Sequence, residues 1–164
     1  MRRMMEVNTG DASGRLADEL VRFSRLGVRA KSMLHVRDFG AEFSALMLLF
    51  PLRHLGPLRI TDLAEAKGAD PSTVSRQAAQ LVKAGLARRE ADPSDGRASR
   101  LAVTPEGLEA CRQLHEARNA LIGQALTGWP AERVRTFTEL FHEFNSSVEA
   151  LVRSDPAVPA RENA

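Results

Sequence analysis

The chain has 164 residues, and its formal net charge of +2 is too mild to identify a partner class by itself. This length suits one domain with a substantial core, and the single cysteine excludes a disulfide within the chain and favours a reducing compartment. The longest apolar run, residues 45–52, is too short to cross a bilayer, and the N-terminus lacks the apolar segment of a secretory signal. We therefore expect a cytoplasmic protein without a membrane partner.

Apolar residues at helical spacing predict two helices at the start of the chain. Leu16 and Leu20 belong to the apolar positions that recur from Ser13 to Leu34, with arginines between them. A second helix is expected over residues 41–55. Pro51 should kink this helix or end it early, because proline cannot donate the helical hydrogen bond.

Short elements are expected after the break at residues 56–57. Residues 58–60 are a plausible short strand. Thr61 is then expected to cap a short helix, which Gly68 closes.

Asp70 and Pro71 predict the start of a longer helix that runs to about Ala84. Aspartate is a favoured N-cap, and proline fits the first helical position, where no N–H is needed. Two short strands, residues 86–90 and 98–103, should follow and flank a turn-rich loop.

Two long helices are predicted for the rest of the chain. Thr104 caps the first, which runs to about Thr127, and the second covers residues 131–153. Apolar residues of the second helix alternate in steps of three and four, an a/d seam that needs another helix against it. Packing on the chain's own long helix is one alternative, but we expect a homodimer. The candidate dimerisation residues are Leu16, Leu20, Val134, Phe137, Phe141, Phe144, Val148 and Leu151.

The helix predicted over residues 71–84 has the side chains of a DNA-reading helix. Residues 71–101 carry six basic and three acidic side chains, an excess that favours a phosphate partner. The polar face of the helix contains no acid, unlike an ordinary solvated face, and its Arg, Gln and hydroxyl groups suit base edges and phosphates. With two arginines of the hairpin, the candidate DNA-binding residues are Ser72, Thr73, Ser75, Arg76, Gln77, Gln80, Lys83, Arg97 and Arg100.

The loop between the two predicted strands is expected to act as a wing. The carboxylates of Asp92 and Asp95 can brace the loop and Arg97. A positioned arginine suits the narrow, electronegative minor groove beside the helix. A plain hairpin is the alternative, but the loop of a plain hairpin rarely contains two aspartates and an arginine in this order.

Five segments of the chain resemble the MarR family (multiple-antibiotic-resistance regulators). They are residues 56–64, 70–76, 81–86, 92–97 and 101–107. The resemblance implies a homodimer with interlocked terminal helices and two winged lobes on a pseudo-palindromic operator. It also implies repression that a small-molecule inducer relieves. The ligand pocket of the family has no fixed motif, so the ligand-binding residues are unknown.

Other functions have weaker support in the sequence. Cys111 and His115 have a spacing that can hold zinc, but two ligands are not a site, so a packed thiol is favoured over a thiol- or metal-responsive regulator. An enzyme based on His115 or His142 lacks a convergent partner set, and we expect no catalysis, cofactor or metal. A winged protein-interaction module without specific DNA binding is disfavoured, because residues 71–84 carry no acid.

The sequence therefore predicts a mainly α-helical winged helix-turn-helix protein with a small β wing. Its expected function is that of a ligand-responsive repressor that binds double-stranded DNA as a homodimer. The expected layout is a single domain over residues 1–164, with the DNA-binding lobe at 57–104, the helical dimerisation region at 11–55 and 105–153, and flexible tails at 1–10 and 154–164.

Overall fold

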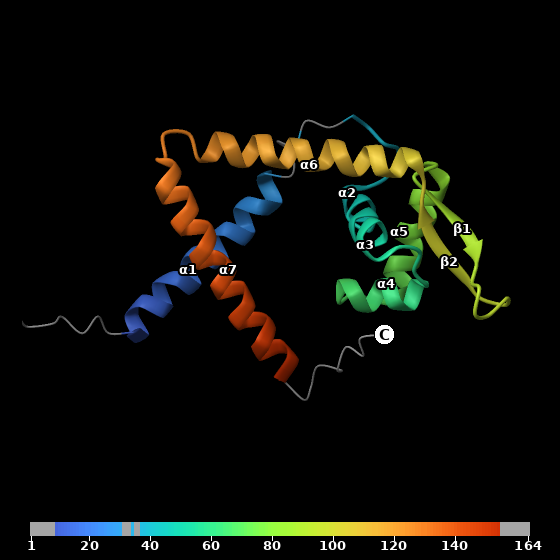
Figure 1. Cartoon of the computed structure of the whole chain (residues 1–164), viewed down its shortest axis with the longest axis horizontal. Helices are drawn as coiled ribbons and strands as arrows, with labels where there is room; N and C mark the ends of the chain where they lie inside the picture. The colour runs from blue at the N-terminus through green and yellow to red at the C-terminus, as the bar shows by residue number, and fades with distance from the viewer. Residues whose placement is uncertain (1–8, 31–33, 35–36, 155–164) are drawn as a thin grey trace, which may run out of the picture. The chain divides into compact units, whose positions relative to one another are not determined.

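The computed structural model describes residues 9–30, 34 and 37–154 (Figure 1). These residues form mainly α-helices and one two-stranded antiparallel sheet, which confirms the predicted class. None of the described helices is both long and apolar enough to cross a membrane. The elements are α1 (Thr9–Ala30), α2 (Phe43–Leu46), α3 (Leu49–Leu55), α4 (Ile60–Lys67), α5 (Pro71–Lys83), β1 (Ala87–Ala91), β2 (Ser99–Val103), α6 (Pro105–Ala125) and α7 (Ala131–Ser154).

The chain divides into two compact units, residues 1–121 and 122–164, with the boundary inside α6. In the first unit, buried apolar side chains between Phe39 and Leu114 form one cluster. Helix α5 is central to it, since it contacts α2, α4 and β1, while α3 contacts α4 and β2. We call the part from α2 to β2, with the start of α6, the lobe.

Residues 41–55 form two short helices, not the single helix expected. The break lies at residues 47–48, because the ring of Pro51 would clash with the carbonyl of residue 47 in a continuous helix. The helix thus ends early, as predicted from Pro51, and the proline itself lies in the first turn of α3, where a missing N–H leaves no helical bond unmade. Both helices bury leucines in the lobe core, although this segment was predicted to belong to the helical dimerisation region.

The start of α4 also differs from the prediction. The helix begins at Ile60, and its N-cap residue is Arg59, so the predicted Thr61 cap was wrong. The hydroxyl of Thr61 donates instead to the carboxylate of Asp62 at 3.1 Å. The predicted end at Gly68 is confirmed, because this residue adopts the left-handed conformation with φ of 59°.

The sheet consists of β1 and β2 alone in the described residues. Residues 58–60 do not form the expected strand, because Ile60 already belongs to α4. Leu58 makes an isolated bridge to Leu101 of β2 through two backbone hydrogen bonds, of 3.1 and 2.7 Å. The predicted hairpin is confirmed, with its loop at residues 92–98.

Local capping signals explain the starts of α5 and α6. Asp70 Oδ1 accepts two backbone N–H groups of the first turn of α5, at 2.8 and 3.2 Å, and Pro71 follows as the first helical residue. Thr104 Oγ1 accepts the backbone N–H of Gly107 at 3.1 Å. Both predicted caps are confirmed.

Helix α6 approaches the lobe closely at Gly107, which is buried. A Cβ atom at this position would overlap the backbone carbonyl oxygen of Leu86 and crowd the side chain of Val103. Only glycine therefore allows the helix to lie at this distance from the residue before β1.

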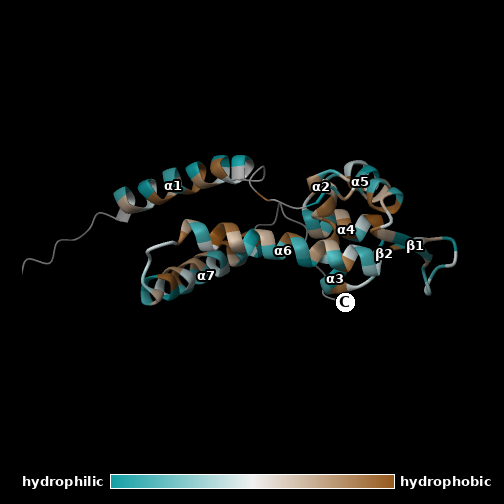
Figure 2. Ribbon diagram, turned by 90° about the horizontal axis from the view of Figure 1, so that it is seen from above, coloured by the Kyte–Doolittle hydropathy of each residue, from teal (hydrophilic) through white to brown (hydrophobic). Residues whose placement is uncertain are grey.

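The first and last helices show their apolar residues to solvent. Helix α1 begins earlier than the predicted Ser13 and ends at Ala30; residues 31–33 lie outside the described ranges. Helix α7 contains no buried residue, and Figure 2 shows hydrophobic and hydrophilic residues alternating around both helices. Of the predicted flexible tails, residues 1–8 and 155–164 lie outside the described residues, while the remainder is helical.

Candidate nucleic-acid interface

Helix α5 buries one side and shows the other to solvent, as its periodicity predicts. Val74, Ala78 and Leu81 are buried in the lobe core. The candidate DNA-binding residues lie on the opposite side, with Ser72, Arg76 and Lys83 exposed and Thr73, Ser75, Gln77 and Gln80 half-buried.

The first turn of α5 is ordered by its own hydrogen bonds. Ser72 Oγ donates to Asp70 Oδ1 at 2.5 Å, and Arg76 Nη2 donates to Thr73 Oγ1 at 3.5 Å. The side-chain hydrogen bond from Ser72, followed by the backbone N–H bonds, lowers the pKa of Asp70, so this cap is anionic at neutral pH. The hydroxyl of Ser72 is therefore engaged in the helix cap. The guanidinium of Arg76 is more accessible to a partner than this hydroxyl.

Gln80 takes part in the packing of the lobe. Its Oε1 accepts the backbone N–H of Glu42, just before α2, at 3.1 Å. The candidate contact with DNA therefore competes with a contact inside the chain. The same end of α5 borders a hollow of about 410 Å³, lined by Asp38, Gly40, Ala41, Glu42, Gln80 and Lys83.

Two aspartates shape the wing loop from within. Asp92 Oδ1 accepts the backbone N–H of Ser94 at 2.8 Å and its hydroxyl at 2.6 Å. Asp95 Oδ1 accepts the backbone N–H of Arg97 at 3.0 Å. Among the described residues, neither aspartate pairs with the guanidinium of Arg97, so they hold the loop backbone and not that side chain.

The two candidate arginines of the hairpin have different surroundings. Arg97 is exposed in the wing loop. Arg100 is half-buried in β2 and pairs with Glu90, its partner in the register, at 3.4 Å, while Arg88 contacts the same carboxylate at 3.2 Å. The side chain of Arg97 is therefore accessible to solvent, whereas Arg100 is engaged in the sheet.

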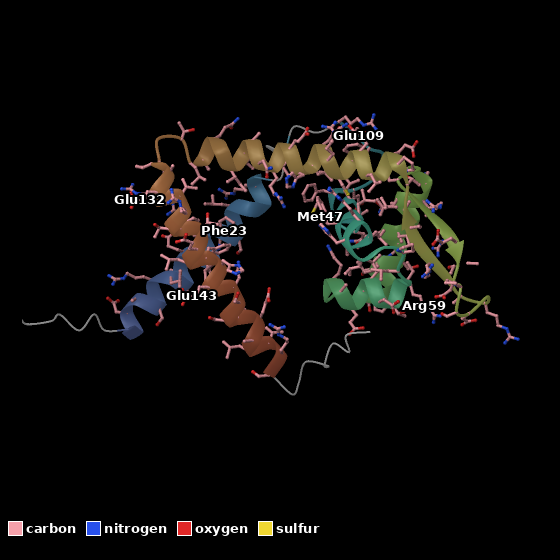
Figure 3. The ribbon with its side chains drawn as sticks, in the orientation of Figure 1. Phe23, Met47, Arg59, Glu109, Glu132 and Glu143 are labelled. Atoms are coloured by element: carbon pink, nitrogen blue, oxygen red, sulfur yellow. The ribbon has the colours of Figure 1, made fainter. Side chains whose placement is uncertain are left out.

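Arg59 contacts the wing, although it was not among the residues predicted for the site. Its Nε donates to Asp92 Oδ2 at 2.6 Å, and Figure 3 shows Arg59 at the start of α4 beside the wing loop. The two residues are 33 positions apart, so no local pattern connects them. A charged residue between Leu58 and Ile60 was the only available signal.

The surroundings of Cys111 and His115 do not form a metal site. Cys111 is fully buried, and burial raises the pKa of its thiol. His115 is exposed, with its ring nitrogens near Arg118 and Asn119. In the part of the chain that the structure describes, no three His, Cys, Asp or Glu side chains gather as metal ligands would.

Comparison with known proteins identifies the family. The sequence model of the MarR family matches residues 43–99, which include α2 to α5, β1 and the wing loop. YxaD, an HTH-type transcriptional regulator of Bacillus subtilis, is 37% identical over 111 residues, which are 68% of this chain and 78% of that protein. The chain belongs to the MarR family.

Solved structures have the same fold as this MarR-family chain. RV1404 of Mycobacterium tuberculosis is 27% identical with a TM-score of 0.66, over 81% of this chain and 94% of that one. PcaV, a transcriptional regulator of Streptomyces coelicolor solved with its natural ligand, is 26% identical with a TM-score of 0.56, over 88% and 99% of the two chains. The comparisons confirm a winged helix-turn-helix fold and a DNA-binding transcription regulator.

Proposed function

We propose that this MarR-family regulator represses transcription by binding a pseudo-palindromic operator as a homodimer, and that a small-molecule inducer releases it. The protein acts in the cytoplasm, on double-stranded DNA. The observation that carries the proposal is the solvent side of α5, which offers Arg76 and Gln77 next to a braced wing and has no acidic side chain.

The arrangement supports two kinds of DNA contact. In winged helix-turn-helix proteins, the second helix of the motif enters the major groove with its N-terminal part nearest the bases. Arg76 and Gln77 lie in the second turn of α5, and arginine and glutamine pair with guanine and adenine edges. Arg97 extends from the wing loop and suits the minor groove beside the helix.

The solvent exposure of α7 supports a homodimer. Phe137 and Phe141 are 52% and 40% exposed, although their rings stack on each other with centroids 6.0 Å apart. An apolar seam along a helix of 24 residues is too extensive to remain in water. A second copy of the chain offers the same seam in return, and two lobes then meet two half-sites.

An inducer is supported by a structural relative of this chain. PcaV was solved with its natural ligand bound. We assign no residue of this protein to inducer binding, and the chemical class of the inducer is open.

Arg76 and Arg97 should contribute to DNA binding in different ways. The probe is a duplex selected by the full-length protein from a pool with a randomised core. Arg76→Ala should cost about 1–3 kcal/mol on this duplex and relax the preference at particular base pairs. Arg97→Ala should weaken binding to the selected duplex and to the random duplex alike. It should also lower the salt dependence of the affinity by about one counterion per site. Fluorescence anisotropy at a series of salt concentrations measures both effects.

Arg135→Ala is the matched control, because it removes the same charge from an exposed position on α7, outside the seam. This variant should bind both duplexes like the parent. Negligible and equal losses for the Arg76 and Arg97 variants on both duplexes would reject DNA binding by this surface.

A further inference from the structure

Arg59 joins the first helix of the DNA-binding motif to the wing. It is the N-cap residue of α4, and Asp92 directly follows the last residue of β1. The guanidinium donates from Nε to Asp92 at 2.6 Å and from Nη2 to Ser94 Oγ at 3.5 Å. The guanidinium at the start of α4 therefore holds two side chains of the wing loop, those of Asp92 and Ser94.

Asp92 is the buried partner of this pair. With 6% of its surface exposed, it is the one buried polar or charged residue in the described ranges. A buried carboxylate needs an opposite charge and hydrogen bonds in place of water. Arg59 and Ser94 supply them, and the hydrogen bond from Arg59 is the largest cause that holds the pKa of Asp92 well below its ordinary value.

The position of Asp92 determines where the wing loop leaves the sheet. Its backbone N–H donates to the carbonyl of Ala98 at 3.1 Å, which closes the loop. Next to Arg59, Leu58 is bridged to Leu101 on the other strand. A side-chain bond to the end of β1 and a backbone bridge to β2 therefore fix the hairpin against the start of α4.

We propose that Arg59 is a positioning residue for the wing: by holding Asp92, it sets the direction of the wing relative to the helix-turn-helix and so places Arg97 for the minor groove. The inference rests on the proposed DNA binding. A loop that is held in place before binding loses less conformational freedom on the DNA than a mobile loop does. Loss of the hydrogen bond between Arg59 and Asp92 therefore lowers the affinity for DNA, although it removes no direct contact with DNA.

A direct phosphate contact is the competing role for Arg59. Its side chain is 39% exposed, and a guanidinium has donors to spare after the bonds to Asp92 and Ser94. The two roles differ in one respect. A positioning residue acts through Arg97, whereas a phosphate contact acts independently of it.

The first experiment measures wing mobility without DNA. A nitroxide label is attached to Gly96→Cys, a loop position where an added Cβ meets no atom within 4 Å and φ is not positive. The native Cys111 is buried, and Cys111→Ala removes any labelling there. We expect Arg59→Met and Asp92→Asn to increase the mobility of the label, and Arg53→Met, at an exposed arginine of α3, to leave it unchanged.

The second experiment is a double-mutant cycle with the selected duplex. Arg59→Met should lower affinity by roughly tenfold, the size expected for one misplaced side-chain contact. In the Arg97→Ala background, the same substitution should produce little further loss, because the residue that it positions is gone. Asp92→Asn, which keeps the shape of the side chain, should repeat this pattern if Arg59→Met folds poorly.

Two outcomes would overturn the proposal. One is a label spectrum that neither Arg59→Met nor Asp92→Asn alters. The other is an equal loss of affinity for Arg59→Met with and without Arg97, which identifies Arg59 as a phosphate contact. Failure of the proposed function looks different, because the parent protein would then select no duplex while the label still reports whether Arg59 holds the wing.

Discussion

Asp92 and Asp95 look equivalent in the sequence of the wing but perform different tasks in the structure. Asp95 shapes a local turn by accepting the N–H of Arg97, two residues later. Asp92 makes the same type of local bond to Ser94 and also accepts the long-range bond from Arg59. The local bonds follow from an Asx pattern, and only the fold reveals the partner on α4.

The Asp92 carboxylate should make the folded protein acid-sensitive. Its pKa is lower in the folded state than in the unfolded chain, so its contribution to stability is complete above the unfolded pKa of about 4 and is lost as the pH falls toward the lower folded value. The thermal midpoint of the parent should therefore fall more steeply between about pH 5 and pH 3 than that of Asp92→Asn. Equal slopes in calorimetry would show that the carboxylate is not stabilised by folding.

The thiol of Cys111 should be unreactive in the native protein and dispensable for regulation. Its thiol is fully buried and its pKa is raised by burial, so the reactive thiolate is scarce in the native protein. A colorimetric thiol reagent at mildly alkaline pH should react only after denaturant is added. Cys111→Ala should repress and respond to inducer like the parent. Release of the parent from DNA by peroxide, without release of this variant, would establish redox sensing instead.

At the scale of elements, two glycines of α6 should respond oppositely to the same substitution. Gly107→Ala places a Cβ against the carbonyl oxygen of Leu86, so the helix must move away from the lobe, at a cost of at least the roughly 1–3 kcal/mol of ordinary overpacking. At Gly123, no atom lies within 4 Å of an added Cβ, and alanine should stabilise the helix by about 0.5–1 kcal/mol. Denaturant titrations measure both, and a neutral Gly107→Ala would contradict the close approach.

Elements with local signals were predictable from the sequence. Asp70, Thr104 and Gly68 begin or end helices through bonds within a few residues, and all three were predicted. Two of the wrong predictions concern features that depend on distant partners. Leu58 bridges to β2 instead of forming a strand, and Arg59, not Thr61, is the N-cap residue of α4.

The candidate interface was predictable to a similar degree. Periodicity alone separated the buried side of α5 from its solvent side. The contacts of Gln80 with Glu42 and of Arg100 with Glu90 depend on how the elements pack, which spacing along one helix or strand does not determine.

At the scale of the whole molecule, the seam of α7 should hold two copies together. Phe141→Asp places a charge in the middle of the apolar seam and should give monomers or aggregates with weaker operator binding, because a buried, unpaired carboxylate opposes association. His142→Asp adds the same group one residue further along α7 and should leave the dimer intact. Sedimentation at micromolar concentration distinguishes the species, and a monomeric parent protein would refute the dimer.

Because the described buried core is confined to residues between Phe39 and Leu114, operator binding by the proposed homodimer should depend steeply on protein abundance. A lobe with its own core does not need the partner chain in order to fold, so dilution separates protomers before it unfolds lobes. A separated protomer still reads one half-site, but it loses the high effective concentration that the first lobe provides for the second. Occupancy of the operator would then fall steeply as the number of chains in the cell falls, while every remaining lobe stays competent to bind.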